Sequence, residues 1–182
     1  MWLLLGALVL GAGVRLWLVG RVPPVALLWD HHEYVSWSAQ LREGGLGPFY
    51  EQMPPNIRMW REGRATNVVA PVEITRVCNY PPLSAYMFIL EGRALTLRQD
   101  EFISNTQAAR VIYALPSMLA DVLLAAGCFA LVRLRAGPFA SALAAAVIFC
   151  APPVIIDSAR WGQTDSWVLA PAVWMLWCMK QF

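Results

Sequence analysis

The chain has 182 residues, of which 58% are hydrophobic and only 14% are charged. Because soluble domains carry about 25% charged residues, this composition argues against a water-soluble globular protein. Nine Trp, thirteen Pro and twelve Gly are typical of a membrane protein, in which Trp anchors at interfaces and helices tolerate Gly and Pro. A net charge of +2 provides no basic field, so nucleic acid is not expected as a partner.

The first predicted element is an apolar segment at residues 1–20. It carries no charge from residue 2 to residue 14, and the apolar character resumes after Arg15. About 18 such residues suffice to cross the hydrocarbon core. A positively charged start and a small-residue cleavage site are not evident, so the pattern favours a retained membrane anchor over a signal peptide. We expect Arg15 to snorkel to the membrane surface.

Residues 21–109 hold eight Arg and nine acidic residues, which predicts a large water-exposed loop. Near its start, Tyr34, Trp37 and Leu41 recur at helical spacing, and glycines follow. This pattern predicts a short amphipathic helix in the membrane interface directly after the first span.

Two further elements are predicted inside this loop. Segment 81–97 is apolar, but Glu91 and Arg93 in its body make a membrane span costly. It is therefore interpreted as a second interfacial helix, started by its two prolines. Segment 51–79 lacks a sustained period, although residues 68–77 favour a short strand that Pro71 confines to a sheet edge.

From residue 110 onward the chain is mostly apolar and predicts further spans at 110–133, 138–156 and 166–182. Arg133, Arg135 and Lys180 then fall on the cytoplasmic side. The loop at 21–109 and the loop after the third span both fall on the outer side. The predicted fold is an all-α membrane protein with about four transmembrane helices and a large outer loop bearing interfacial helices.

Asp30 is the first candidate functional residue. Followed three residues later by Glu33, it resembles a capping box, in which it satisfies free N–H groups at a helix start. The other interpretation is a carboxylate held at the membrane surface as a general base or metal ligand. Spacing alone favours the cap, and the two roles are compatible because a cap also fixes a carboxylate in place.

His31 and His32 point about 100° apart on a helix, so they do not chelate one ion together. Either one binds a phosphate or contacts Asp30, or both are ordinary interfacial histidines. Further along, Tyr80 precedes two prolines that make a rigid turn into the second interfacial helix.

The loop after the third span, residues 157–165, packs unusual polar residues between apolar helices. Such residues are costly near a membrane and are functional candidates. For Arg160 and Gln163 the functional interpretation is favoured over a structural one. For Asp165 the alternative is a helix cap, and for Trp161 it is an interfacial anchor.

Two further charged residues lie in the second span. Asp121, near mid-membrane, must pair with a polar group or face a wet cavity, so it is either structural or catalytic. Arg110, at the outer end, either snorkels or meets an anionic head group. The sequence contains no nucleotide-binding glycine loop and no GxSxG motif, so a soluble nucleotide-activated substrate is not favoured.

Together these motifs resemble the N-terminal part of a GT-C superfamily glycosyltransferase, similar to bacterial GPI-mannosyltransferase-like proteins and to polyprenyl-phosphate-sugar-dependent glucosyltransferases. The most specific motif is the WGQ-x-D-S element at 161–166. Tyr-Pro-Pro-Leu at 80–83 is moderately specific, and Asp30 alone is weak. Phe49-Tyr50, Tyr86 and Pro116 with Asp121 also carry the resemblance, which extends over most of the chain.

The resemblance implies inverting transfer of a hexose, such as mannose or glucose, from a polyprenyl-phosphate carrier to a glycan, lipid or protein acceptor. Asp30 would be the general base, and a cation would stabilise the departing phosphate. The implied substrate-binding residues are His31, Glu33, Tyr80, Arg110, Arg160, Trp161, Gln163 and Asp165. Metal use differs within the superfamily, so a divalent cation is left open and no metal ligands are assigned.

The implied location is the bacterial inner membrane, among membrane lipids, with the site on the extracytoplasmic side. Superfamily members have eight or more spans, so this chain corresponds to a fragment or a truncated reading frame. The segments are a first transmembrane helix at 1–20, an extracytoplasmic loop at 21–109 and three further helices at 110–182. The alternative function is a non-enzymatic four-span protein, either a transporter component or a lipid-binding assembly factor.

Overall fold

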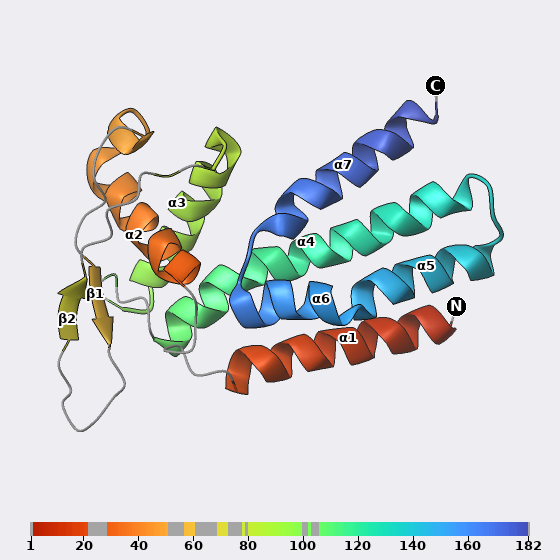
Figure 1. Cartoon of the computed structure of the whole chain (residues 1–182), viewed down its shortest axis with the longest axis horizontal. Helices are drawn as coiled ribbons and strands as arrows, with labels where there is room; N and C mark the ends of the chain where they lie inside the picture. Colours follow the sequence, from red (N-terminus) through yellow and green to blue (C-terminus); the bar gives the residue numbers. More distant parts are fainter. Residues whose placement is uncertain are drawn as a thin grey trace. The chain divides into compact units, whose positions relative to one another are not determined.

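The computed structural model describes residues 2–21, 29–50, 57–60, 69–72, 78, 80–99, 102 and 106–181. The chain divides into two compact units, which are described separately. Unit 1 comprises residues 1–21 and 114–182, and unit 2 comprises residues 22–113. The described residues are mainly helical, as predicted (Figure 1).

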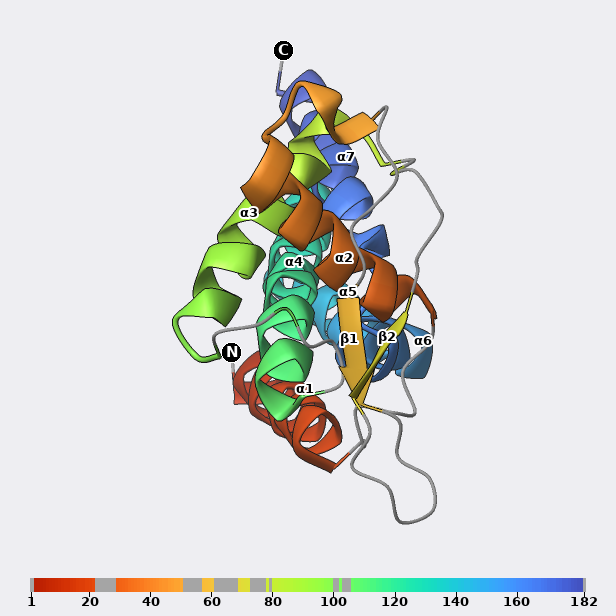
Figure 2. The same cartoon turned by 90° about the vertical axis from the view of Figure 1, so that its left-hand side faces the viewer.

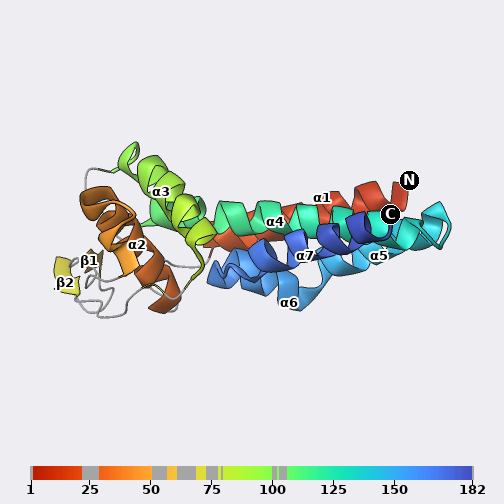
Figure 3. The ribbon, with the colours of Figure 1, turned by 90° about the horizontal axis from the view of Figure 1, so that it is seen from above.

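Unit 1 contains α1 (Trp2–Arg21), most of α4 (Gln107–Arg133), α5 (Pro138–Cys150), α6 (Pro152–Ile155), the π-helix η3 (Ile156–Trp161) and α7 (Asp165–Met179). The ribbon in Figure 3 shows α7 running beside α4. The indole N–H of Trp174 donates to the Leu123 carbonyl oxygen at 2.9 Å, which joins these two helices.

Residues 4–21 of α1 and the whole of α4 are long and apolar enough to cross a membrane. Many of their apolar side chains point outward, which is what a lipid environment favours. The exposed large hydrophobic residues of α1 and α4 include Leu5, Val9, Leu10, Leu16, Trp17, Leu119, Val122 and Leu123. These two helices indicate a membrane protein.

Among the described residues, two helices and at most three segments are long and apolar enough to span, so the four predicted spans are not confirmed. The predicted span at 138–156 is broken, because Ala151 has an extended backbone with ψ 125° ahead of two prolines, and proline disfavours helical geometry in the residue before it. The halves on either side of Ala151 are bent by 48°, and they count as a third span only if the bent pair is taken together. With 15 residues, α7 is shorter than the roughly 20 that cross a bilayer.

Unit 2 contains α2 (Trp29–Gly44), the 3-10 helix η2 (Pro48–Tyr50), strands β1 (Ile57–Trp60) and β2 (Val69–Val72), α3 (Pro82–Thr96) and the first turns of α4. The two strands pair antiparallel, with Arg58 opposite Pro71 (Figure 2). The predicted strand around Pro71 is therefore present, and the small sheet departs from a purely helical fold.

Helix α2 is present as predicted, but it is not amphipathic. Residues 31–41 are all buried, polar ones included. The Ser38 hydroxyl donates to the Tyr34 carbonyl oxygen, and the Gln40 amide donates to the Phe49 carbonyl oxygen. Because such bonds offset the cost of desolvating polar groups, the polar side of the helix is enclosed rather than solvated.

Helix α3 is the second predicted helix of the loop and starts at the expected prolines, with Pro81 as its N-cap. Its buried face consists of Ser84, Ala85, Phe88, Glu91, Gly92 and Leu95. Its exposed side includes Leu83, Tyr86 and Leu90. The apolar residues that face outward suit the interfacial position predicted for this segment.

Candidate functional site

The predicted site residues divide between the two units. Unit 2 holds Asp30, His31, Glu33, Tyr80 and Arg110. Unit 1 holds Arg160, Trp161, Gln163 and Asp165. The local surroundings of each group are therefore considered within its own unit.

Asp30 lies in the first turn of α2, which begins at Trp29. The residue is thus inside the helix, and the predicted capping box, with Asp30 ahead of the first turn, is wrong. Asp30 is half-buried, whereas all side chains from residue 31 to residue 41 are buried. A carboxylate in the first turn is stabilised by the positive end of the helix dipole. The helix therefore presents one acidic group on an otherwise enclosed segment.

The two histidines next to Asp30 face into unit 2. His31 has no exposed surface, and its ring meets Tyr113 edge to face at a centroid distance of 5.7 Å. Burial lowers the pKa of His32 to about 4, so this imidazole is neutral at neutral pH. Both histidines are therefore buried in unit 2.

Tyr80 belongs to an aromatic cluster between α2 and α3. Its hydroxyl lies 2.9 Å from the Tyr34 hydroxyl in a hydrogen bond. Its ring packs edge to face on Trp37 and on Phe88. Such contacts fix ring orientation and add to burial. Tyr80 is half-buried, so the cluster locks the turn before α3 while leaving part of this side chain accessible.

Glu33 and Arg110 are both enclosed in unit 2. Glu33 is 5% exposed and Arg110 has no exposed surface. Of the two alternatives for Arg110, snorkelling or contact with an anionic head group, the burial of its side chain argues against snorkelling. A guanidinium is expensive to bury without polar contacts, so Arg110 contributes to the interior of unit 2 instead of lying at a membrane surface.

Glu91 is a buried acid that the sequence analysis did not select as a candidate. It is 4% exposed, and neither carboxyl oxygen has a hydrogen-bond partner among the described residues. Burial raises the pKa of Glu91 well above its usual value, which favours the protonated form. The signal was available in the sequence, because an acid stood in the body of an apolar helix.

The predicted loop of unit 1 is anchored by a sharp turn. The Gln163 N–H donates to the Asp157 carbonyl oxygen at 3.0 Å, and Gly162 adopts a positive φ of 69°, a conformation that glycine accepts readily. Arg160 and Asp165 are exposed. The loop therefore presents both a cation and a carboxylate at the surface of unit 1.

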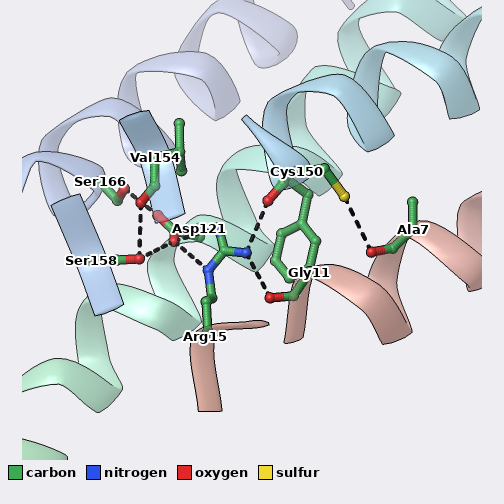
Figure 4. Close-up of polar contacts among 9 residues, drawn as sticks. Ala7, Gly11, Arg15, Asp121, Cys150, Val154, Ser158 and Ser166 are labelled. Carbon is green, nitrogen blue, oxygen red and sulfur yellow. Dashed lines mark hydrogen bonds and ion pairs between the residues drawn. The ribbon is translucent and has the colours of Figure 1, made fainter. Parts of the chain in front are cut away.

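Asp121 contacts the same loop through two serine side chains, as Figure 4 shows. Asp121 is fully buried and accepts hydrogen bonds from Ser158, near the start of the loop, and from Ser166, directly after it. Because both ends of the loop bind one carboxylate, Asp121 restricts how far they can separate. This arrangement favours the structural interpretation of Asp121.

Arg15 is the charged partner of Asp121. Its Nε and Nη2 atoms lie 2.9 Å and 2.8 Å from one carboxylate oxygen, and Nη1 donates to the carbonyl oxygens of Gly11 and Phe149. Arg15 is 1% exposed, so the predicted snorkelling is wrong. A buried acid elsewhere in the fold offered a better partner than the membrane surface, since the pair and its hydrogen bonds compensate for lost hydration.

Among the described residues, no group of three His, Cys, Asp or Glu side chains is placed to hold a metal ion. Comparison of the chain with protein families, curated proteins and solved structures finds no match.

Proposed function

We propose that this chain is part of an integral-membrane glycosyltransferase of the GT-C type, which transfers a hexose from a polyprenyl-phosphate donor to an acceptor with inversion. The observation that carries the proposal is the accessibility of Asp30. It is the one side chain between residues 30 and 41 that is not buried. A helix that carries an accessible carboxylate in its first turn is suited to a general base, which must be held in position relative to its substrate.

In the proposed reaction, the Asp30 carboxylate accepts the proton of an acceptor hydroxyl. The hydroxyl oxygen forms a bond with the anomeric carbon, and the bond from that carbon to the phosphate oxygen breaks. Polyprenyl phosphate leaves with the bonding electron pair. A single displacement from the face opposite the leaving group inverts the anomeric centre.

Arg160 is the proposed partner of the leaving phosphate. A cation stabilises the negative charge that develops there, and the Arg160 side chain is exposed. His31 and Arg110 are less suited to this role because neither has exposed surface. Gln163 and Trp161, on the same loop, would contact the sugar through a hydrogen bond and an aromatic face.

The proposed location is the bacterial inner membrane, with the reaction on its outer side. Two helices long and apolar enough to span support membrane insertion. The basic residues Arg133, Arg135 and Lys180 support a cytoplasmic position for the loop after α4 and for the end of α7. The loops that carry Asp30 and Arg160 would then share the outer compartment.

The test is transfer of labelled sugar from polyprenyl-phosphate mannose or glucose to alkyl glycosides, measured with the full chain in proteoliposomes. Asp30→Asn keeps the size of the side chain but removes the base, so we expect transfer to fall about 10²–10⁴-fold. The matched control is Glu43→Gln, which removes a carboxylate at the opposite end of the same helix. Its transfer rate is expected to match that of the unchanged chain.

Donor binding is measured in parallel with the same vesicles. Asp30→Asn is expected to bind the polyprenyl-phosphate sugar normally, because the base acts on the acceptor. Full turnover by Asp30→Asn would remove this residue from the mechanism. Absence of both transfer and saturable donor binding, in a chain that is folded and inserted, would favour the non-enzymatic alternative. Binding of soluble solutes would then identify a transport component.

A further inference from the structure

Unit 2 contains a cavity of about 330 Å³ between the second half of α2 and α3. Its lining residues come from these two helices and are Ser38, Leu41, Arg42, Ile89, Gly92, Arg93 and Thr96. The volume is within the range of small-molecule sites. The cavity lies near the end of α2 opposite Asp30, so it is separate from the proposed general base.

The floor of the cavity is a close contact between the two helices. A Cβ atom on Gly92 would lie 3.0 Å from the Ser38 Cβ atom, so the glycine allows α3 to approach α2 at this level. Ser38 donates its hydroxyl to the Tyr34 carbonyl oxygen, and Thr96 donates to the Arg93 carbonyl oxygen. Both hydroxyl protons are thus used within their own helices.

The two arginines provide the charge of the cavity. Arg42 comes from α2 and Arg93 from α3, and both are exposed. Neither forms an ion pair with a carboxylate among the described residues. The Arg42 guanidinium lies 5.6 Å from the centre of the Phe102 ring, which limits its movement. Two arginines that line one cavity are suited to binding a phosphate group.

An apolar strip borders this cavity along α3. Leu83, Tyr86 and Leu90 are 70%, 55% and 57% exposed and recur at helical spacing, so they form one face. Arg93 continues the same spacing and stands between the strip and the cavity. A ligand with a phosphate headgroup and a hydrocarbon tail would satisfy both surfaces at once. A free phosphate would use only the arginines.

We propose that this cavity binds the headgroup of a phosphate-bearing anionic lipid, with the acyl chain lying along Leu83, Tyr86 and Leu90. The site holds unit 2 against an anionic leaflet, because basic residues near a negatively charged membrane surface are attracted to it. It is independent of the proposed sugar transfer, because it needs neither donor nor acceptor.

The test uses the full chain in detergent with fluorescent phosphatidylglycerol as the probe, and anisotropy as the readout. Arg42→Gln combined with Arg93→Gln is expected to weaken binding by about tenfold or more, the effect of losing roughly one charge-assisted contact. The control is Arg98→Gln, which removes one positive charge, half of what the double variant removes, from an exposed residue of unit 2 outside the cavity. Its affinity is expected to stay within about twofold of the unchanged chain.

A second arm separates a lipid from a free phosphate. Leu90→Asn is expected to weaken phosphatidylglycerol binding, whereas inorganic phosphate at millimolar concentration is expected to compete poorly. Efficient competition by inorganic phosphate, together with no effect of Leu90→Asn, would overturn the lipid assignment. Equal losses in the double variant and in Arg98→Gln would overturn the cavity itself. Far-ultraviolet circular dichroism of every variant verifies that the helical content of the chain is unchanged.

Discussion

Units 1 and 2 each enclose at least one acidic side chain, and two of these, Asp121 in unit 1 and Glu91 in unit 2, have opposite surroundings. Asp121 in unit 1 accepts hydrogen bonds from Arg15, Ser158 and Ser166. Glu91 in unit 2 has no hydrogen-bond partner among the described residues. A buried carboxylate with a complete set of donors holds elements together, whereas one without donors costs stability when it ionises. Burial alone therefore does not reveal what an acidic residue contributes.

The Asp121 arrangement also explains how distant segments are joined. Arg15 and Asp121 are 106 residues apart in the chain, and Asp121 then reaches the loop through Ser158 and Ser166. One carboxylate thus connects α1, α4, η3 and the start of α7. In the proposed reaction, these bonds would fix the base of the loop that carries Arg160 and Gln163.

The largest predicted effect follows from removing Asp121, the buried carboxylate that has hydrogen-bond donors. Asp121→Leu leaves the Arg15 guanidinium buried without its counter-charge, and we expect the free energy of unfolding to fall by about 3–5 kcal/mol. Titration with a denaturing detergent, followed by tryptophan fluorescence, measures this loss. The matched control is the double variant Arg15→Met with Asp121→Leu, which removes both charges and is expected to recover most of the stability. A single variant as stable as the unchanged chain would show that the ion pair is dispensable.

A smaller effect concerns the packing beside Arg15. A Cβ atom on Gly11 would lie 2.7 Å from the Phe149 ring and 3.3 Å from the Arg15 guanidinium. Gly11→Ala is therefore expected to destabilise unit 1 by about 1–3 kcal/mol in the same titration. Gly13, on the same helix, has nothing within 4 Å of its added Cβ. Gly13→Ala should leave stability unchanged or raise it slightly, and equal losses at both glycines would contradict the packing explanation.

The smallest predicted effect concerns Glu91, the buried acid without a hydrogen-bond partner among the described residues. Because the folded-state pKa of Glu91 is raised by burial, its contribution to stability is fully present below the unfolded pKa near 4.5. That contribution is lost as the pH rises through the folded pKa. Glu91→Met keeps the side-chain length without an ionisable group. We expect it to gain on the order of 1 kcal/mol over the unchanged chain at pH 8.

The measurement for Glu91 is the thermal midpoint of both chains at pH 5 and pH 8, taken as a difference so that other titrating groups cancel. The gain of the Glu91→Met variant should shrink toward pH 5, where the carboxyl group is protonated. A gain of the same size at both pH values would mean that ionisation of Glu91 is not its cause.

Much of the helical framework was predictable, because local patterns report local structure. The apolar runs located α1 and α4, the prolines at 81–82 located the start of α3, and Pro71 indicated an edge strand. The break at Ala151 was also readable from the two prolines after it. The apolar composition of residues 138–156 favours one continuous span, whereas the two prolines favour a break. In the structure the prolines determine the backbone at Ala151.

The sequence by itself determined which segments are helical and apolar, because those properties depend on residues a few positions apart. The sequence also placed Asp30 at the start of a helix, but it did not predict how accessible the side chain is. Only the tertiary structure decided that Arg15 pairs with Asp121 instead of reaching the membrane surface, that residues 31–41 of α2 are buried, and that Glu91 has no hydrogen-bond donor among the described residues. Those outcomes depend on which groups meet across long separations in the chain, and the spacing of residues along a helix carries no information about the partner on another helix.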